Sequence, residues 1–331
     1  MNYLVTGGAG FIGSHLVELI LKTDSKVIVL DKLTYASSQW TPPDSNGNFK
    51  FIKVDIANRN ELAHYAEIAR EFLGEGFSIF HLAAESHVDR SINSADVFMH
   101  SNVLGTQVML DFAKQVKASR FLHISTDEVY GSLEKGEAAE TASLNPSSAY
   151  SASKAASDLV ALAHHKTFGT EVIVTRCVNN FGPRQSLEKF IPRAISRALK
   201  GLPIPIYGKG VNIREWIYVM DHCKILLTLM QEGESGQIYN IGTRERRTNL
   251  EIAHLLFRAL NLPFAIDHVP DRLGHDFRYA LDSTRISCWL GKTPLLSIEE
   301  GLKLTIAYYE EYAHTKEFEK EYALMENSYA R

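Results

Sequence analysis

Two kinds of apolar pattern alternate along the first half of the chain. Short apolar runs, each ended by polar or turn-forming residues, occupy 2–6, 27–30, 51–54, 79–83, 121–125 and 171–175. Between them, apolar residues recur at helical spacing over about 11–22, 59–73, 95–117 and 148–168. Runs rich in Val, Ile and Leu are typical of strands that are buried on both faces. The alternation therefore predicts an α/β fold with a doubly wound parallel sheet.

The pattern changes after about residue 178, where glycine and proline become frequent and the elements become shorter. Helices are expected near 187–200, 220–231, 248–260 and 297–312. We predict a sheet domain over 1–177, with return segments near 211–236, and a smaller α+β lobe over 178–331. The charged tail at 313–331 is expected to be a surface helix or partly disordered.

Length and composition narrow the class of protein. The 331 residues, 45% hydrophobic and 22% charged, can bury a large core without disulfides or metals. A net charge of −4 argues against a nucleic-acid partner, and no apolar run reaches the roughly 18 residues of a membrane span. Three widely spaced cysteines fit neither a disulfide framework nor a zinc site, and the start does not resemble a signal peptide. We expect a cytoplasmic protein without a bound metal.

A glycine-rich loop, with Gly7, Gly10 and Gly13, follows the first strand. Glycines at this spacing allow a tight turn and the close approach of a diphosphate, which the free N–H groups of the next helix can bind. Asp31 ends the second strand 18 residues after Gly13 and can accept a hydrogen bond from a ribose 2′-OH. An acidic residue there disfavours a 2′-phosphate. We therefore expect a Rossmann-type site for NAD rather than NADP, although Lys32 follows directly.

The other residues expected at the cofactor lie next to this loop or at the carboxyl ends of strands, where ligands bind in open parallel sheets. They are Phe11, Ile12, Lys32, Asp55, Ile56, Ala83 and Ser125. Asp55 and Ile56 close the third strand and are expected near the adenine.

Tyr150 and Lys154 lie four residues apart in a segment of helical spacing, which puts both side chains on one face. A phenol has a pKa near 10 and is a poor base at neutral pH. A neighbouring ammonium group and a positively charged nicotinamide favour the phenolate, which is a usable base. The pair is therefore predicted to oxidise an alcohol by hydride transfer to NAD.

Two adjacent acids, Asp127 and Glu128, follow Thr126 at the carboxyl end of the fifth strand. Buried acids are costly unless they have partners or a catalytic role. In one interpretation Asp127 caps a turn and Glu128 lies in solvent. The other interpretation is catalytic. It requires a bend, because in a straight strand Asp127 would face away from Thr126 and Glu128.

Beyond the glycine loop, six segments carry a resemblance to a known family. They are HLAAESHVDRS at 81–91, STDEVYG at 125–131, YSASK at 150–154, NNFGP at 179–183, IREW at 213–216 and DRLGHD at 271–276. Together they resemble the extended short-chain dehydrogenase/reductases, and more narrowly the dTDP-glucose 4,6-dehydratases, over nearly the whole chain. Related decarboxylases usually carry Ser where Asp127 stands, and epimerases carry small residues there.

The resemblance implies a role for each residue of the reacting centre. Tyr150 would take the proton of the sugar 4-OH while C4 gives hydride to NAD, with Thr126 holding the 4-oxygen and Lys154 the nicotinamide ribose. Glu128 would remove the C5 proton, and Asp127 would protonate the departing 6-OH. Hydride return to C6 would give a 4-keto-6-deoxyglucose on its nucleotide, with dTDP-glucose as the expected substrate. Asp127 must then be protonated while Glu128 is ionised, as two close carboxyls in a dry site can be.

The resemblance also implies that the second lobe binds the nucleotide sugar. Six residues are expected to contact this substrate, namely His87, Asn179, Arg214, Asn249, Arg272 and His275. Of these, the two arginines are expected to bind its diphosphate. Relatives dimerise through two helices per subunit, so a homodimer is expected through the helices near 95–117 and 148–168. The open alternatives are a 4-epimerase or a UDP-glucuronate decarboxylase of the same family, a 4,6-dehydratase of another nucleotide-hexose, and an NAD-sensing binding protein.

One loop departs from the usual sequence of the family. Arg184 stands where an aromatic residue is usual, and Ser186 and Leu187 stand where Phe and Pro are usual. Because this loop is expected close to the sugar nucleotide, the departure leaves another hexose or base open.

Overall fold

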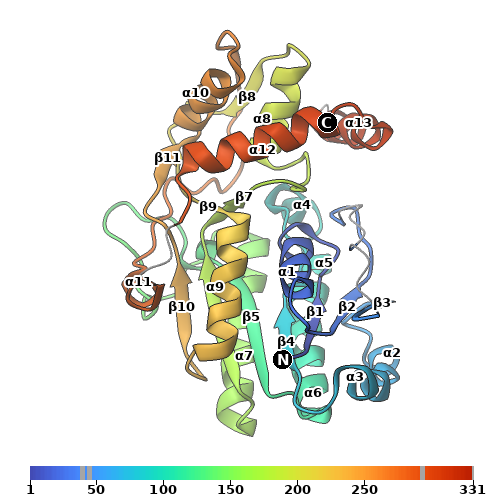
Figure 1. Ribbon diagram of the computed structural model, residues 1–331. Coiled ribbons are helices and arrows are strands. Elements are labelled where there is room, and N and C mark those ends of the chain that lie inside the picture. The colour runs from blue at the N-terminus through green and yellow to red at the C-terminus, as the bar shows by residue number, and fades with distance from the viewer. Residues whose placement is uncertain (38–41, 43–46, 291–294, 330–331) are drawn as a thin grey trace.

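A seven-stranded parallel sheet forms the larger part of the molecule, in the order β10-β6-β5-β4-β1-β2-β3 (Figure 1). The computed structural model describes residues 1–331 except 38–41, 43–46, 291–294 and 330–331. The strands of this sheet are β1 (Tyr3–Thr6), β2 (Val27–Asp31), β3 (Phe49–Lys53), β4 (Ser78–His81), β5 (Arg120–Thr126), β6 (Val172–Cys177) and β10 (Ile238–Ile241). The predicted doubly wound α/β fold is confirmed.

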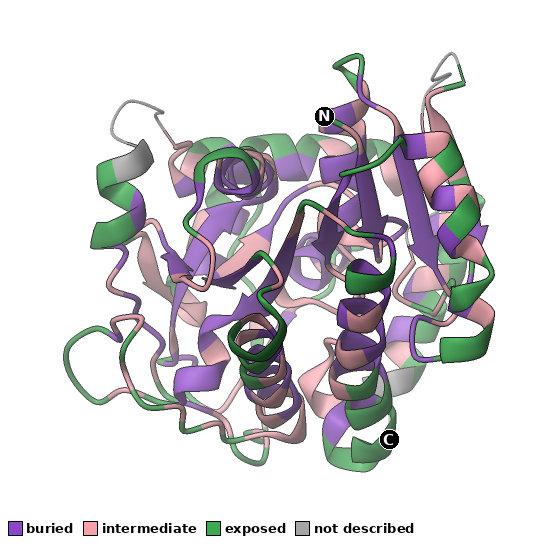
Figure 2. Cartoon of the chain, turned by 90° about the horizontal axis from the view of Figure 1, so that it is seen from below, coloured by how far each residue is buried: buried purple, intermediate pink, exposed green. Residues whose placement is uncertain are grey.

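Successive residues of each strand pack toward opposite faces of this sheet. Val27 and Val29 of β2 belong to one core cluster, whereas Ile28 and Leu30 belong to another. Figure 2 shows the strands buried between layers of helices. The helices of the first face are α1 (Phe11–Leu21) and α9 (Val219–Glu232), and those of the second are α2 (Arg59–Ala63), α3 (Tyr65–Leu73), α6 (Gly105–Gln115) and α7 (Ala149–Phe168). Continuous apolar runs therefore mark strands that are covered on both sides.

The segment predicted as one helix over 95–117 is interrupted. After α4 (Val88–Asn93), α5 (Ala95–Phe98) runs into a π-helical turn, η1 (Met99–Leu104), and only then into α6. Asn102 of this turn is buried, and its side-chain amide bonds both the N–H and the C=O of Glu85. A π turn inserts one residue into the helical repeat, often at functional sites. Here it aims Asn102 at the segment that follows β4.

The second lobe has two small sheets. β7 (Asn179–Phe181), β9 (Ile213–Tyr218) and β11 (Arg246–Thr248) form one of them, and β8 (Ile204–Tyr207) pairs with β12 (Ile266–Val269) in the other. The later helices are α8 (Phe190–Leu199), α10 (Asn249–Leu260), α11 (Thr284–Leu290), α12 (Ile298–Tyr312) and α13 (Lys316–Tyr329). Helices α8, α10, α12 and α13 share a third apolar core with these strands. The chain returns to the large sheet through α9, which packs on α1, and through β10.

The tail forms a surface helix, α13, which is one of the two expected outcomes, but one face of this helix is buried. Phe318, Tyr322 and Met325 are buried in the core of the second lobe. The ring of Phe318 meets that of Tyr312 edge to face, with centroids 5.6 Å apart. The three buried residues lie at i, i+4 and i+7, so one face of the tail is apolar and docks on the lobe.

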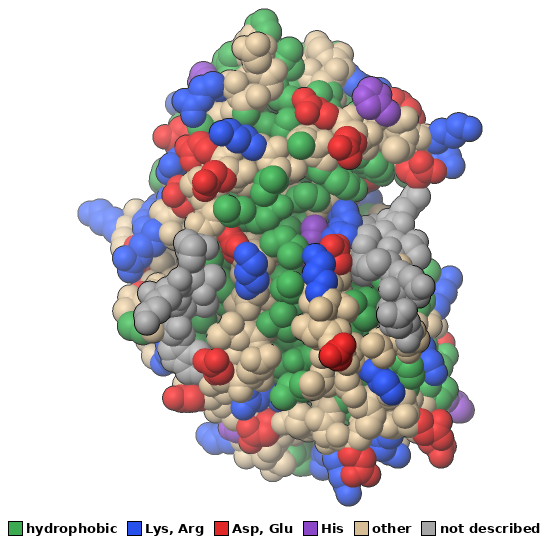
Figure 3. All heavy atoms as spheres, in the orientation of Figure 1, with side chains coloured by type: hydrophobic (Ala, Val, Ile, Leu, Met, Phe, Trp, Pro, Cys, Tyr) green, Lys and Arg blue, Asp and Glu red, His purple; other side chains and the backbone are tan. Residues whose placement is uncertain are grey.

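The surface shows no dominance of one charge on the face drawn in Figure 3, where basic and acidic side chains are interspersed. None of the helices in the described part of the chain combines the length and the apolar character needed to cross a bilayer. Within the same residues, no three His, Cys, Asp or Glu side chains gather in a way that could hold a metal ion.

Replacing Gly131 tests whether the backbone next to the predicted catalytic acids tolerates a Cβ atom. It follows η2 (Asp127–Tyr130), a 3₁₀ turn, with φ of +72°, and a Cβ on it would lie 2.1 Å from the C=O oxygen of Asn145. Gly131→Ala is expected to lower the free energy of unfolding by more than the roughly 1–3 kcal/mol of left-handed backbone strain alone. The control is Gly136→Ala, since Gly136 has φ of +73° and open space around it. Equal losses in thermal unfolding would contradict the steric role of Gly131.

Candidate active site

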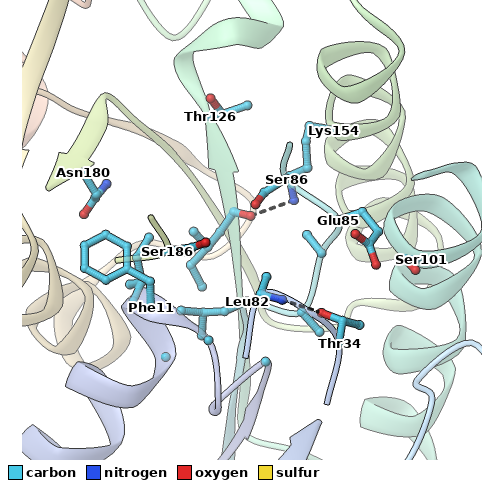
Figure 4. A pocket seen from close by; sticks show the side chains of 18 of the residues that line it. Phe11, Thr34, Leu82, Glu85, Ser86, Ser101, Thr126, Lys154, Asn180 and Ser186 are labelled. Atoms are coloured by element: carbon cyan, nitrogen blue, oxygen red, sulfur yellow. Dashed lines mark hydrogen bonds between the residues drawn. The ribbon is translucent and has the colours of Figure 1, made fainter. Parts of the chain in front are cut away.

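One cleft crosses the carboxyl ends of the central strands and continues toward the second lobe. It is lined by every residue predicted for the cofactor and for catalysis, together with Asn179. Figure 4 shows Thr126 from β5 and Lys154 from α7 around this cleft, with Phe11 of α1 and Ser186 also at its wall. Side chains from distant parts of the sequence therefore meet where the parallel strands end, as open α/β sheets require.

The glycine loop is built for close contact with a ligand. A Cβ on Gly13 would lie 2.2 Å from the C=O oxygen of Gly7, and one on Gly7 would lie 2.7 Å from the Ala83 nitrogen. Gly7 also has φ of +69°. No side chain caps the N-terminus of α1, so its first N–H groups are left for a ligand. A helix N-terminus with free N–H groups suits the diphosphate of a dinucleotide.

The Asp31 carboxylate faces the cleft and also binds the backbone of the glycine loop. Its carboxylate accepts hydrogen bonds from the backbone N–H groups of Ala9, at 3.0 Å, and Leu33, at 2.8 Å. Burial raises the pKa of this carboxyl, while these two bonds oppose the shift. A carboxylate has lone pairs for about four hydrogen bonds, so Asp31 can still accept one from a ribose hydroxyl.

The ammonium group of Lys32 already interacts with neighbouring polar side chains. Its ammonium group donates to the Ser101 hydroxyl at 2.8 Å and lies 3.8 Å from carboxylate oxygens of both Asp55 and Glu85. A lysine held in this way does not favour a 2′-phosphate at the end of β2. The contacts of Asp31 and Lys32 therefore fit NAD.

The chain bends at the end of β5, as the catalytic interpretation requires. Thr126 caps the 3₁₀ turn η2: its hydroxyl accepts from the Glu128 N–H at 3.3 Å and donates to the Asp127 carboxylate at 3.2 Å. Asp127 is only 3% exposed, and its other carboxylate oxygen has no hydrogen-bond partner among the described residues. The cap of the turn is Thr126, and both acids line the cleft, so the purely structural interpretation of this pair is wrong.

Burial raises the pKa of both carboxyls, and to different degrees. The pKa of Asp127 lies well above its ordinary value because of burial and of the nearby Glu128 and Glu215 carboxylates. For Glu128 burial again raises the pKa, but Arg272, Arg214 and Lys189 all oppose the shift. Three cations thus oppose the rise in pKa at Glu128, whereas neighbouring carboxylates add to the rise at Asp127, and this asymmetry makes Asp127 the better proton donor and Glu128 the better base.

The oxidation pair projects from α7. The Lys154 ammonium group donates to the C=O of Ile124 at 2.8 Å, and burial lowers its pKa to about 8. Burial raises the pKa of the Tyr150 phenol well above its ordinary value in the protein alone, and the Thr126 side chain opposes this shift. Both groups are thus desolvated. A bound cation next to the phenol, such as an oxidised nicotinamide, would favour the phenolate strongly in such surroundings.

Of the six residues predicted to bind substrate, five do not line the cleft. Arg214 is buried and donates to the C=O of Asp276 at 2.8 Å, and Arg272 lies 3.5 Å from Asp89 with a buried Nε that has no partner among the described residues. Both arginines still act on the Glu128 carboxyl. They therefore lie behind the acid pair, on the side of the second lobe.

The other three residues have local partners. His87 caps α4, accepting from the Arg90 N–H at 3.4 Å, and burial lowers its pKa to about 3. His275 bonds the Asp271 carboxylate at 2.6 Å, and Asn249 opens α10, its N–H donating to the C=O of Asn212. Their roles toward a nucleotide stay predictions.

Several cleft residues were not named from the sequence, and two residues of the loop expected near the sugar nucleotide lie elsewhere. The unnamed residues include Thr34, Glu85, Ser86, Ser101, Cys177, Asn180, Gln185, Glu188 and Lys189, whereas Ser186 lines the cleft as expected for its loop. Glu85 and Ser86 belong to the HLAAESHVDRS segment, which was the available signal. Arg184 does not line the cleft, because its guanidinium turns to α1 and pairs with Glu18 at 2.9 Å. Leu187 is fully buried in the core of the second lobe.

Comparison with known proteins places this site in a family. The NAD dependent epimerase/dehydratase family matches residues 3–242. The chain belongs to this family. A dTDP-glucose 4,6-dehydratase of Actinoplanes sp. is 44% identical over 319 residues, which cover 93% of this chain and 98% of the relative.

Solved structures of two activities share this fold. The structure of DesIV, a dTDP-glucose 4,6-dehydratase from Streptomyces venezuelae with NAD bound, matches with a TM-score of 0.88 and 44% identity, covering 94% of this chain and 97% of that one. A UDP-glucose 4-epimerase from Thermus thermophilus, also with NAD, matches with a TM-score of 0.86 and 29% identity, covering 94% and 99%. The backbone thus hardly separates the two activities, and the residues of the site must do so.

Because folding disfavours ionisation of the Asp127 carboxyl, we predict that replacing Asp127 stabilises the folded protein. A carboxyl whose pKa is raised by folding destabilises the folded state above the unfolded pKa near 4, by about 1.4 kcal/mol for each unit of the shift that the pH has passed. Asp127→Asn is therefore expected to unfold at a higher temperature than the parent near pH 7, and the difference should vanish near pH 4. Nucleotide-free protein is to be used, in thermal unfolding at both pH values.

Asp158→Asn is the matched control. Asp158 is equally buried, but its pKa is lowered because hydrogen bonding to His123 and the charges of His123 and Arg176 outweigh burial. Its replacement should therefore destabilise at neutral pH. A loss of stability in the Asp127 variant as well would contradict the inferred surroundings of that carboxyl.

Proposed function

We propose that the protein is an NAD-dependent nucleotide-sugar 4,6-dehydratase that converts dTDP-glucose to dTDP-4-keto-6-deoxyglucose. The observation that carries the proposal is the pair Asp127 and Glu128, which lie beside Thr126 at the end of β5 and line one cleft, with Arg272, Arg214 and Lys189 acting on Glu128. Loss of water needs an acid for the leaving hydroxyl and a base for the C5 proton. Epimerisation and decarboxylation need neither, which makes them the weaker alternatives.

The residues divide the reaction between them. When bound, NAD supplies the oxidant that takes hydride from C4 of the sugar and returns it to C6. Tyr150, which lines the cleft together with Thr126 and Lys154, accepts the proton of the 4-OH. The resulting ketone acidifies the C5 hydrogen, which Glu128 removes.

Asp127 then gives its proton to the 6-OH, which leaves as water with the electrons of the C6–O bond. Return of a hydride to C6 would leave a bound cofactor as it began, a proton returns to C5, and only water is lost. The buried Asp127 is suited to the acid step because burial and the nearby carboxylates raise its pKa well above the ordinary value.

We assign the nucleotide to the lobe over 178–331 and the cofactor to the sheet domain over 1–177 with its return segments near 211–236. Arg214 and Arg272 are proposed to bind the diphosphate, and the buried, unpartnered Nε of Arg272 supports this. Asn179 is proposed to contact the hexose from the wall of the cleft. His87 is proposed to face the substrate, and Asn249 and His275 are proposed on the nucleotide side.

Mass spectrometry of products tests the function. The protein is incubated with NAD and, separately, with dTDP-, UDP-, GDP- and CDP-glucose. Loss of 18 Da, one water, from dTDP-glucose without net NADH is expected. Water loss only from another nucleotide sugar would keep the mechanism and change the substrate, and none from any of them would overturn the dehydratase proposal.

Glu128→Gln assigns the steps within this experiment. It is expected to reduce dehydration by about 10²–10⁴-fold while still oxidising C4, so NADH absorbance should accumulate on the protein. Tyr150→Phe is the control, since it should block oxidation and leave no NADH. Turnover of Glu128→Gln at the parental rate would show that its role is wrong.

We also propose that the protein is a cytoplasmic homodimer. All three cysteines are free thiols, which suits a reducing compartment. Large apolar side chains are exposed along the two helices expected at the interface, at Val97, Met99, Leu104 and Leu159. Pairing of these helices with those of a second copy would form a four-helix bundle.

Leu159→Glu tests the dimer, since Leu159 is 58% exposed on α7. Light scattering is expected to give twice the chain mass of 37.1 kDa for the parent and a dissociation constant raised at least about tenfold in the variant. Leu324→Glu, on the outer face of α13, is the control and should leave the mass unchanged. A monomeric parent at micromolar concentration would rule out the proposed dimer.

A further inference from the structure

The C-terminal helix α13 contacts a loop of the active-site cleft. The backbone N–H of Leu187 donates to one carboxylate oxygen of Glu321 at 2.8 Å, and the Tyr312 hydroxyl donates to the other at 3.0 Å. From α12, the Tyr309 hydroxyl donates to the C=O of Gln185. The last two helices thus hold the backbone of the loop at 184–189.

The side chains of this loop reach the cleft. Gln185, Ser186, Glu188 and Lys189 all line it, whereas Arg184 and Leu187 do not. Figure 4 shows Ser186 at the wall of the cleft. The loop therefore alternates between residues that anchor it and residues that face the cleft.

The other side of the loop is tied to the cofactor half. Arg184, with φ of +65°, bonds the carboxylate of Glu18 on α1 at 2.9 Å. His15 of the same helix donates from Nε2 to the C=O of Pro183 at 2.8 Å and accepts from Arg184 at Nδ1. Burial, with the Arg184 charge, lowers the pKa of His15 to about 4, so this histidine stays neutral and keeps both bonds.

Glu321 has a specific task within α13, because the helix is docked independently of it. Phe318 and Tyr322 are buried in the lobe core, and Glu326 pairs with Arg197 at 2.6 Å. Leu187 is fully buried, so without Glu321 its N–H would lack a partner in an apolar place. The loop, rather than the docked helix, would then have to move to find one.

We propose that Glu321 is a positioning residue for the substrate: from the C-terminal helix it fixes the loop at 184–189 and so sets the place of Ser186 and Lys189 at the sugar nucleotide. The proposal rests on the proposed function. It also reinterprets the departures from the family sequence in this loop. Arg184 and Leu187 rebuild its anchorage on α1 and in the lobe core, and Ser186 alone of the three changes the wall of the cleft.

Steady-state kinetics of three variants tests the proposal. Glu321→Ala is expected to raise KM for dTDP-glucose about tenfold, with kcat within about twofold and the Kd for NAD unchanged, because the loop and not the reacting centre is released. Glu321→Gln keeps an oxygen that can accept from Leu187 and should recover most of the parental KM. Glu326→Ala, on the same helix but without contact to the loop, should leave KM unchanged. Equal KM values for Glu321→Ala, Glu326→Ala and the parent would overturn the proposal.

Hydrogen exchange separates failure of this proposal from failure of the proposed function. Without substrate, the peptide containing 184–189 is expected to exchange at least about tenfold faster in Glu321→Ala than in Glu326→Ala, while peptides of β5 stay unchanged. If the loop at 184–189 exchanged at the parental rate in Glu321→Ala, the proposed positioning role of Glu321 would be contradicted, even if no nucleotide sugar were turned over. If Glu321→Ala does not fold, the same comparison is made between Tyr309→Phe, which removes the bond to Gln185, and Tyr322→Phe, whose hydroxyl has no partner among the described residues.

Discussion

Asp127 and Glu128 follow each other where β5 leaves the sheet, and the rest of the site is arranged around the difficulty of holding two carboxyl groups together away from water. Each disfavours ionisation of the other, and burial disfavours it for both. A turn capped by Thr126 brings both to the same cleft. The cations that act on Glu128 come from the second lobe and the loop that leads into it, at Arg214, Arg272 and Lys189. The acid pair is therefore a property of two lobes rather than of one strand end.

The two halves of the cleft are built by different means. On the cofactor side the ligand-facing groups are mostly backbone: a glycine loop with no room for Cβ atoms and the uncapped start of α1. Because these groups belong to the backbone, substitutions of side chains elsewhere hardly alter them. On the substrate side the groups are side chains carried by loops, and each needs support from elsewhere in the fold. The bonds from α1, α12 and α13 to the loop at 184–189 are such supports.

This difference explains why fold and activity separate in the family. A dehydratase and an epimerase match the backbone almost equally well, with TM-scores of 0.88 and 0.86. In the proposed mechanism, oxidation at a sugar carbon uses the cofactor half and the pair Tyr150 and Lys154. The fate of the oxidised sugar then depends on the residues after Thr126. The same fold can therefore support one oxidation step followed by different second reactions, and few side-chain substitutions are needed to change the second reaction.

Residues that lie close together along the chain were sufficient to predict part of the molecule. Apolar runs and helical spacing predicted the large sheet, the glycine loop and Asp31 predicted the cofactor site, and four-residue spacing placed Tyr150 and Lys154 on one face. The other features could be assigned only from the folded chain. The π turn at η1, the docked face of α13 and the turning of Arg184 toward α1 each depend on a partner far away in the sequence; Leu187 and Glu321, for example, are 134 residues apart. Local spacing carries no record of such partners, because they meet only when burial of the separate apolar faces packs the two lobes together.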